Sequence, residues 1–242
     1  MAAGKTNTTL YRVRLGWALL GIVGLGLQAS ATYSLGAFGS FTQVVNFFSY
    51  FTILSNIFIT AWFVLAFLSM QRGQARWWGD DPAIKGALLV AGGVTIIVYW
   101  LLLKDIPVQG GPAGDIANLL LHGFVPLGLW IDWLIAGDPM NKPYGAMMGA
   151  WLVYPIVFMI YSEIRGPFVD KPTHPWYPYF FLSPSAPPAG VGGVGPLILA
   201  LIGVSLIFFL AASVLYWLYR KRGGVQFVPV GKAQVSRAGR RR

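Results

Sequence analysis

The chain has 242 residues, of which 56% are hydrophobic and only 11% are charged, with 18 Lys and Arg against 8 Asp and Glu. A soluble globular domain usually contains about 25% charged residues, so this composition argues against that class. Long apolar runs and 15% aromatic residues argue against a disordered chain, despite 30 Gly and 16 Pro. Apolar runs of roughly 20 residues, the length that crosses a bilayer, recur along the sequence. The sequence therefore predicts a polytopic membrane protein.

Six membrane spans are expected, each a continuous apolar run rather than a series of short alternating strands. Backbone groups in lipid must form their hydrogen bonds internally, so continuous runs of this length predict α-helices. The expected fold class is all-α, with a single six-helix transmembrane domain over residues 1–219 and a basic tail over residues 220–242. The expected spans are 15–33, 46–68, 84–103, 116–136, 144–162 and 197–219.

The distribution of basic residues predicts that both termini are cytoplasmic. Of the 18 Lys and Arg residues, 15 lie on the side of the two termini, eight of them after residue 219. Cytoplasmic segments carry such an excess, and the expected location is the plasma membrane. The tail lacks interleaved aromatic residues and any recognisable nucleic-acid module, so lipids rather than nucleic acids are the expected partners. The oligomeric state does not follow from the sequence.

The content of metal-ligating residues predicts neither a metal site nor a cofactor. The chain contains no Cys and two His, which excludes iron–sulfur clusters, thiolate metal sites and a histidine-rich zinc site. Only His122 falls within an expected span, because His174 lies in the long loop 163–196. A bis-histidine haem inside the bundle is therefore excluded as well.

A threonine and a histidine are expected at the same depth in the membrane. Thr52 lies six residues into the second expected span and His122 six residues into the fourth, both counted from the outer side. At helical spacing each belongs to a polar face. The two faces consist of Ser49, Thr52, Asn56 and Thr60 on one span and of Asp115, Asn118, His122 and Pro126 on the other. They predict a hydrated pocket that opens toward the outside.

The chemistry that fits this pair is nucleophilic catalysis. A neutral imidazole can remove the proton of a hydroxyl within hydrogen-bond reach and so activate Thr52 for attack. The supporting or oxyanion candidates are the polar side chains beside the pair, Ser49, Asn56 and Asn118. No third catalytic group is evident, and the orienting or rim candidates are Asp115, Glu163 and Arg165.

Each of these residues also has a structural interpretation. Thr52 could bond its own helix, His122 could join two helices, and Glu163 with Arg165 could form an ion pair at the rim. Loop 163–196 could anchor the chain at the membrane interface or cover the pocket.

Four motifs resemble the bacterial family of predicted six-transmembrane membrane proteins. They are NFFSYFTILSN at 46–56, HGFVPLGLWIDWL at 122–134, YPIVFMIYSEIRG at 154–166 and WYPYFFLSP at 176–184, with Ser183 where the family has an acidic residue. That family is distantly similar to the animal androgen-induced and androgen-dependent TFPI-regulating proteins, which are intramembrane threonine hydrolases of fatty acid esters of hydroxy fatty acids. The resemblance implies that Thr52 is the nucleophile and His122 its base.

The sequence thus favours an intramembrane hydrolase of lipid esters, but two alternatives remain. One is a small proton-coupled transporter in which His122, Asp132 and Glu163 relay protons, because ionisable groups at membrane depth often mark such paths. The other is a non-catalytic protein that binds lipids.

Overall fold

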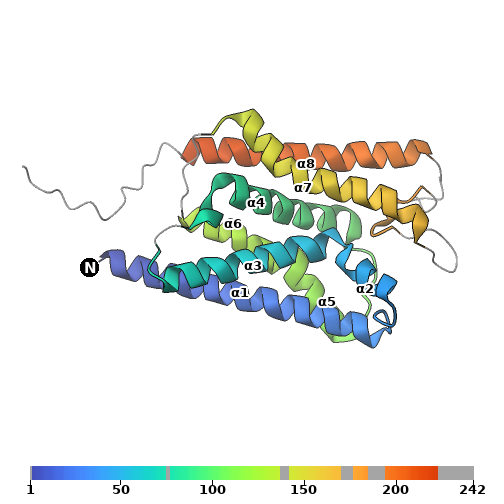
Figure 1. The fold of residues 1–242 in the computed structure, drawn as a ribbon, viewed down its shortest axis with the longest axis horizontal. Coiled ribbons are helices and arrows are strands. Elements are labelled where there is room, and N and C mark those ends of the chain that lie inside the picture. The colour runs from blue at the N-terminus through green and yellow to red at the C-terminus, as the bar shows by residue number, and fades with distance from the viewer. Residues whose placement is uncertain (1, 75–76, 137–141, 170–176, 185–193, 223–242) are drawn as a thin grey trace, which may run out of the picture.

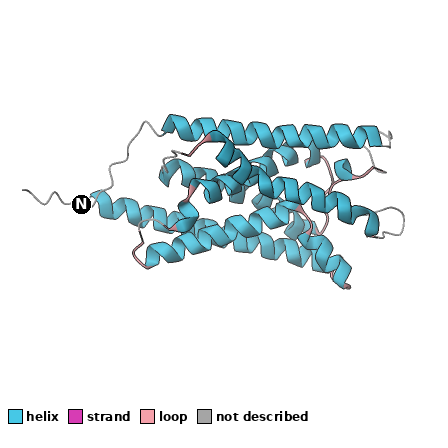
Figure 2. Ribbon diagram, turned by 45° about the horizontal axis from the view of Figure 1, so that its top comes forward, coloured by secondary structure: helices cyan, strands magenta, loops and turns pink. Residues whose placement is uncertain are grey.

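The chain folds into a bundle of long helices. A computed structural model describes residues 2–74, 77–136, 142–169, 177–184 and 194–222, and within these residues it contains helices and turns but no β-strand (Figure 2). Among these residues six helical segments are long and apolar enough to cross a membrane, so the expected all-α class is confirmed and the expected multi-pass arrangement is compatible with the helices. They are Leu10–Ser34, Phe51–Gln71, Pro82–Leu103, Gly111–Ala136, Tyr144–Phe168 and Val194–Lys221.

The crossings lie side by side along the long axis of the molecule (Figure 1). They are built from α1 (Ala2–Ser34), α3 (Phe51–Gln71), α4 (Pro82–Val98), the pair α5 (Gly111–Leu119) and α6 (Val125–Ala136), α7 (Tyr144–Arg165) and α8 (Val194–Arg222). Helix α1 packs against α3, α5 and α6, whereas α4 contacts α3, α6, α7 and α8 and so occupies the centre. The start of α1 and the end of α8 lie at the same end of the bundle, opposite α2 (Phe41–Phe48).

The second crossing differs from the expected span because the helix is interrupted before it. Residues up to Phe48 belong to α2, Tyr50 is extended with φ −83° and ψ 131°, and α3 begins at Phe51. Ser49 lies between the two helices, where its Oγ donates to Val45 O at 2.6 Å and bonds the Tyr161 hydroxyl on α7 at 2.7 Å. Thr52 is consequently in the first turn of α3 rather than the second turn of a longer helix.

The other five crossings contain their expected ranges and extend beyond them at one or both ends. The fourth begins at Gly111 instead of residue 116. The preceding residue, Gly110, has φ +90°, and a Cβ there would lie 2.6 Å from the Cβ of Ala31 on α1. Because only glycine combines that backbone conformation with so close an approach, Gly110 allows the fourth crossing to start against α1.

Two wide helical turns occur at the α2 end of the bundle. Segment η2 (Tyr99–Leu103) continues α4, and segment η3 (Leu120–Phe124) joins α5 to α6; both are π-helical. Such turns are rare and are often found at functional sites. A π turn also shifts the helical register, so residues on either side of His122 do not keep the face that regular spacing assigns them.

An ion cluster of Arg14, Asp80, Lys85 and Asp132 joins three crossings at the opposite end. Arg14 Nε and Lys85 Nζ each lie 2.8 Å from a carboxylate oxygen of Asp132, and Arg14 Nη2 lies 3.5 Å from Asp80 Oδ1. The side chains of Lys85 and Asp132 have no exposed surface. Two cations thus face two carboxylates, as a buried cluster requires for charge balance.

Candidate functional site

Thr52 and His122 contact each other between α3 and η3. Thr52 Oγ1 lies 3.0 Å from His122 Nε2, although the two residues are 70 positions apart. Thr52 is buried, whereas His122 is partly exposed on the wall of a large cavity. A hydroxyl and an imidazole at this distance form the hydrogen bond through which a base removes a proton from a nucleophile.

The imidazole is held in the tautomer that this contact needs. His122 Nδ1 lies 3.1 Å from the carbonyl oxygen of Asn118, which can only accept a hydrogen bond. Nδ1 therefore carries the proton and Nε2 presents its lone pair to Thr52. The ring also stacks on Tyr99 with 4.4 Å between centroids, and the Tyr99 hydroxyl accepts from Asn118 Nδ2 at 2.6 Å. The two π-helical turns thereby fix the orientation of the base.

The interruption between α2 and α3 gives Thr52 a particular electrostatic environment. Thr52 is the second residue of α3, and the N–H groups of a first helical turn have no partner within the helix. These N–H groups and the helix dipole favour negative charge near the start of the helix. An alkoxide developing on Thr52, or an oxyanion beside it, is stabilised there.

Asn56 has a different position from the one its expected oxyanion role requires. Its Nδ2 donates to the carbonyl oxygens of Thr52 and Leu121, both at 2.8 Å. The two amide hydrogens are thus used to join α3 to η3, which leaves none for a substrate oxygen. Asn118 likewise directs its amide to Tyr99, so its link to the reacting pair is the carbonyl oxygen that holds His122.

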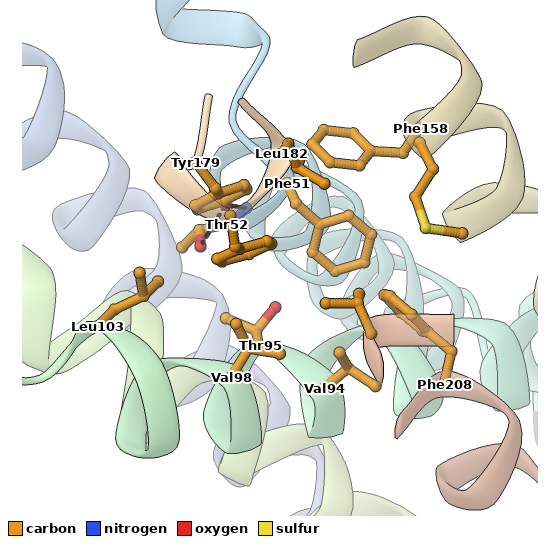
Figure 3. A pocket seen from close by; sticks show the side chains of 13 residues that line it. Phe51, Thr52, Val94, Thr95, Val98, Leu103, Phe158, Tyr179, Leu182 and Phe208 are labelled. Carbon is orange, nitrogen blue, oxygen red and sulfur yellow. Dashed lines mark hydrogen bonds between the residues drawn. The ribbon is translucent and has the colours of Figure 1, made fainter. Parts of the chain in front are cut away.

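Tyr179 completes the site, and the sequence reasoning did not identify it. Its hydroxyl lies 3.3 Å from Thr52 Oγ1 and accepts the Thr52 backbone N–H at 3.2 Å (Figure 3). Burial raises the pKa of Tyr179 to about 12, so the hydroxyl keeps its proton at neutral pH and can donate it in a hydrogen bond. The only signal in the sequence is the aromatic motif at 176–184, which is equally typical of interfacial anchoring.

Thr52 lies between two cavities that differ in size and in polarity. The larger, here called the chamber, has a volume of about 1370 Å³ and lies between the end of α1, α2, η2, α5 and the segment around Tyr179. The smaller, the apolar pocket, has about 30 Å³ and lies among α3, α4, α7 and α8 (Figure 3). Apart from Thr52, Thr95 and Tyr179 its walls are hydrocarbon and thioether, including Val94, Phe158 and Phe208. Thr52 and Tyr179 line both cavities, and His122 lines the chamber.

The remaining expected site residues lie around the pair rather than against it. Ser49 bonds Tyr161 at the junction of α2 and α3. Arg165 Nη2 donates to Asn46 Oδ1 at 2.6 Å, and Glu163 Oε1 is buried with no hydrogen-bond partner among the described residues. Asp115 is exposed on α5 and is not among the residues that line the chamber. None of these carboxylates is placed against His122 as an orienting group, a position that the Asn118 carbonyl takes instead.

Comparisons with protein-family models, curated proteins and solved structures find no match for this chain. In the described part of the chain, no group of three or more His, Cys, Asp or Glu side chains is placed to hold a metal ion. Acyl-transfer sites contain a hydroxyl that is hydrogen-bonded to an oriented imidazole. Here the hydroxyl belongs to Thr52, at the start of α3, and the imidazole to His122.

Proposed function

We propose that this chain is an intramembrane threonine-type hydrolase of lipid esters, with Thr52 as nucleophile and His122 as general base. The observation that carries the proposal is the 3.0 Å contact between Thr52 Oγ1 and His122 Nε2, with Nδ1 engaged by Asn118. The four motifs resemble the bacterial six-transmembrane family, and the distant similarity of that family to the animal intramembrane threonine hydrolases implies the same two residues.

In the proposed first step Thr52 Oγ1 forms a bond to the ester carbonyl carbon while its proton passes to His122 Nε2. The tetrahedral intermediate then collapses, the bond to the alcohol oxygen breaks, and the leaving alcohol takes the proton from His122. In the second step His122 removes a proton from water, which attacks the acyl-threonine. The carboxylic acid leaves and Thr52 recovers its hydrogen through His122.

The groups available to the oxyanion are the Thr52 backbone N–H and the Tyr179 hydroxyl. In the free site the phenolic oxygen accepts a hydrogen bond from that N–H at 3.2 Å. The N–H is therefore able to donate to an oxygen of the substrate in the same region. A shift of the phenol would let both groups donate to the carbonyl oxygen of the substrate. Preorganised donors of this kind usually supply a large part of the rate enhancement in acyl transfer.

The proposed topology places the site on the outer side of the plasma membrane. The excess of Lys and Arg beside both termini favours cytoplasmic termini. Helix α2, after which α3 and Thr52 follow directly, lies at the opposite end of the bundle (Figure 1). The chamber would then take up the ester from the outer leaflet together with water.

The proton-coupled transporter has less support from the geometry. Its relay would have to include Asp132, which is bonded to Arg14 and Lys85 at the far end of the bundle. Asp132 and Glu163 are not among the residues that line the chamber or the apolar pocket. A non-catalytic lipid-binding protein would use the same cavities as the hydrolase. Covalent chemistry at Thr52 therefore distinguishes the hydrolase from the lipid-binding protein.

A fluorophosphonate probe is expected to label the purified wild-type protein covalently at Thr52, because the probe reacts with hydroxyls that a base has activated. Mass spectrometry of the modified peptide measures the position. Thr52→Ala abolishes labelling, and Thr60→Ala, a matched change two turns further along α3 and outside both cavities, retains it. Equal labelling of wild type and Thr52→Ala would refute the proposal.

Tyr179→Phe is expected to lower kcat for ester hydrolysis about 100-fold, with a smaller change in KM. Loss of one oxyanion donor typically costs about 10² to 10³ in kcat, since the bond strengthens only as charge develops. The matched control is Tyr161→Phe, whose hydroxyl bonds Ser49 outside the reacting pair. If Tyr179→Phe hydrolysed esters at the wild-type rate, the phenol would have no part in stabilising the oxyanion.

A further inference from the structure

The walls of the chamber combine apolar side chains with polar side chains that carry no charge. Amide and hydroxyl side chains project from α1, α2, the α4–α5 connection and α5, among them Gln28, Thr32, Gln43, Asn46, Gln109 and Asn118. Of the described residues that line this cavity, none is Asp, Glu, Lys or Arg. Among the described residues, the charged residues that are buried as a whole all belong to the ion cluster at the other end of the bundle.

An uncharged wall selects between the possible alcohol portions of an ester. A carboxylate or phosphate that binds against this wall would exchange part of its hydration without meeting a cation on the described wall, which is unfavourable. Hydroxyl groups carry no such penalty, because amides offer both donors and acceptors to them. The larger cavity therefore suits a neutral, hydroxyl-bearing group better than an ionised one.

One described cation, Arg165, contacts a neutral residue of the chamber wall. Arg165 Nη2 donates to Asn46 Oδ1 at 2.6 Å, and Arg165 itself is not among the lining residues. This bond polarises the amide of Asn46 and makes its N–H groups better donors to an uncharged oxygen. The positive charge of Arg165 thus strengthens a neutral residue of the wall.

We infer that the substrate is an ester whose alcohol portion is uncharged and bears further hydroxyl groups, as in a monoacylglycerol. This inference rests on the proposed hydrolase function. The alcohol portion occupies the chamber, and the first carbons of the acyl chain enter the apolar pocket on the other side of Thr52. Esters of hydroxy fatty acids, which carry a free carboxylate, are the poorer substrates.

The test compares two esters of the same acyl chain, one with glycerol and one with a hydroxy fatty acid, using the full chain in detergent micelles. We expect kcat/KM to be at least tenfold higher for the glycerol ester. The double variant Gln28→Leu, Gln43→Leu lowers the ratio of the two kcat/KM values about tenfold. Gln71→Leu is the matched control, because Gln71 is exposed, bonds Tyr11 and lies outside the chamber.

The outcomes distinguish this inference from the function on which it rests. If Thr52 were labelled and the carboxylate ester were hydrolysed faster than the glycerol ester, only the inference would be overturned. The same would hold if Thr52 were labelled and neither ester were hydrolysed. A loss of the carboxylate preference in Arg165→Gln would then identify the group that selects the charge. Absence of both labelling and hydrolysis would overturn the proposed function and the inference together. Circular dichroism establishes that each variant is folded.

Discussion

His122→Ala is expected to reduce kcat/KM for ester hydrolysis by about 10³- to 10⁴-fold, with kcat carrying most of the loss. A threonine hydroxyl is a weak nucleophile without a base, and the described structure places a single imidazole, that of His122, against Thr52. The residual rate comes from the oxyanion donors and from substrate binding. Initial rates over a range of substrate concentrations separate kcat from KM.

His122→Gln is the informative companion variant. Glutamine can hydrogen-bond Thr52 and fill part of the space, but it cannot accept a proton at neutral pH. We therefore expect the same loss as in His122→Ala if the imidazole is a base. Near wild-type activity in His122→Gln would mean that the residue only packs against Tyr99 and supports the site.

The pH profile of the wild-type enzyme tests the same step. The base acts only when Nε2 is unprotonated, so kcat/KM falls as the pH is lowered and rises to a plateau as one proton is lost. Because burial raises the pKa of Tyr179 to about 12, this phenol does not ionise in the alkaline range of ordinary assays. We therefore expect kcat/KM to fall only on the acidic side of the profile. A second limb that falls near pH 10 would contradict the assignment of Tyr179 as a protonated donor.

The spans could be predicted from the sequence because the length of an apolar run is a local property. Apolar runs identify six crossings without any knowledge of their neighbours. The approach of Thr52 to His122 was also accessible, since polar residues at membrane depth are few and face one another. However, the depth of Thr52 was counted along one helix from Asn46, and the chain is interrupted at Ser49 and Tyr50.

That interruption and the third member of the site depend on contacts far apart in the sequence. No Gly or Pro marks the end of α2. The hydrogen bond that Ser49 forms with Tyr161 at this interruption joins residues 112 positions apart. Tyr179 meets Thr52 across 127 positions, from a loop without a regular period. Neither helical periodicity nor residue spacing carries information on such contacts, nor on the π-helical turns that set the orientation of His122.

Two basic residues counted on the side of the termini also have a role that charge counting does not reveal. Arg14 and Lys85 were counted as residues of cytoplasmic segments, yet both side chains are buried against Asp132. Charge counting treats every Lys and Arg alike, because it contains no information on which of them finds a carboxylate on another crossing.

Asp132→Asn is expected to lower the free energy of unfolding by about 3–5 kcal/mol, the usual cost of breaking a buried ion pair from one side. Asp132 has no exposed surface and accepts hydrogen bonds from Arg14 and Lys85 at 2.8 Å. Its neutralisation leaves two buried cations facing one carboxylate, Asp80. Denaturant titration in detergent micelles measures the loss.

Two further variants separate charge balance from the loss of a single contact. Asp105→Asn breaks an exposed pair with Lys104, whose side chains are 86% and 46% exposed, and exposed pairs contribute about 0–1 kcal/mol. Adding Lys85→Met to Asp132→Asn restores equal numbers of opposite charges and should recover most of the stability. A loss in Asp132→Asn no larger than in Asp105→Asn would contradict the role of the ion cluster. A group that joins three crossings by charge must contribute to the free energy of unfolding. If Asp132→Asn instead kept the wild-type stability but abolished proton flux in liposomes, the proton relay of the transporter alternative would gain support.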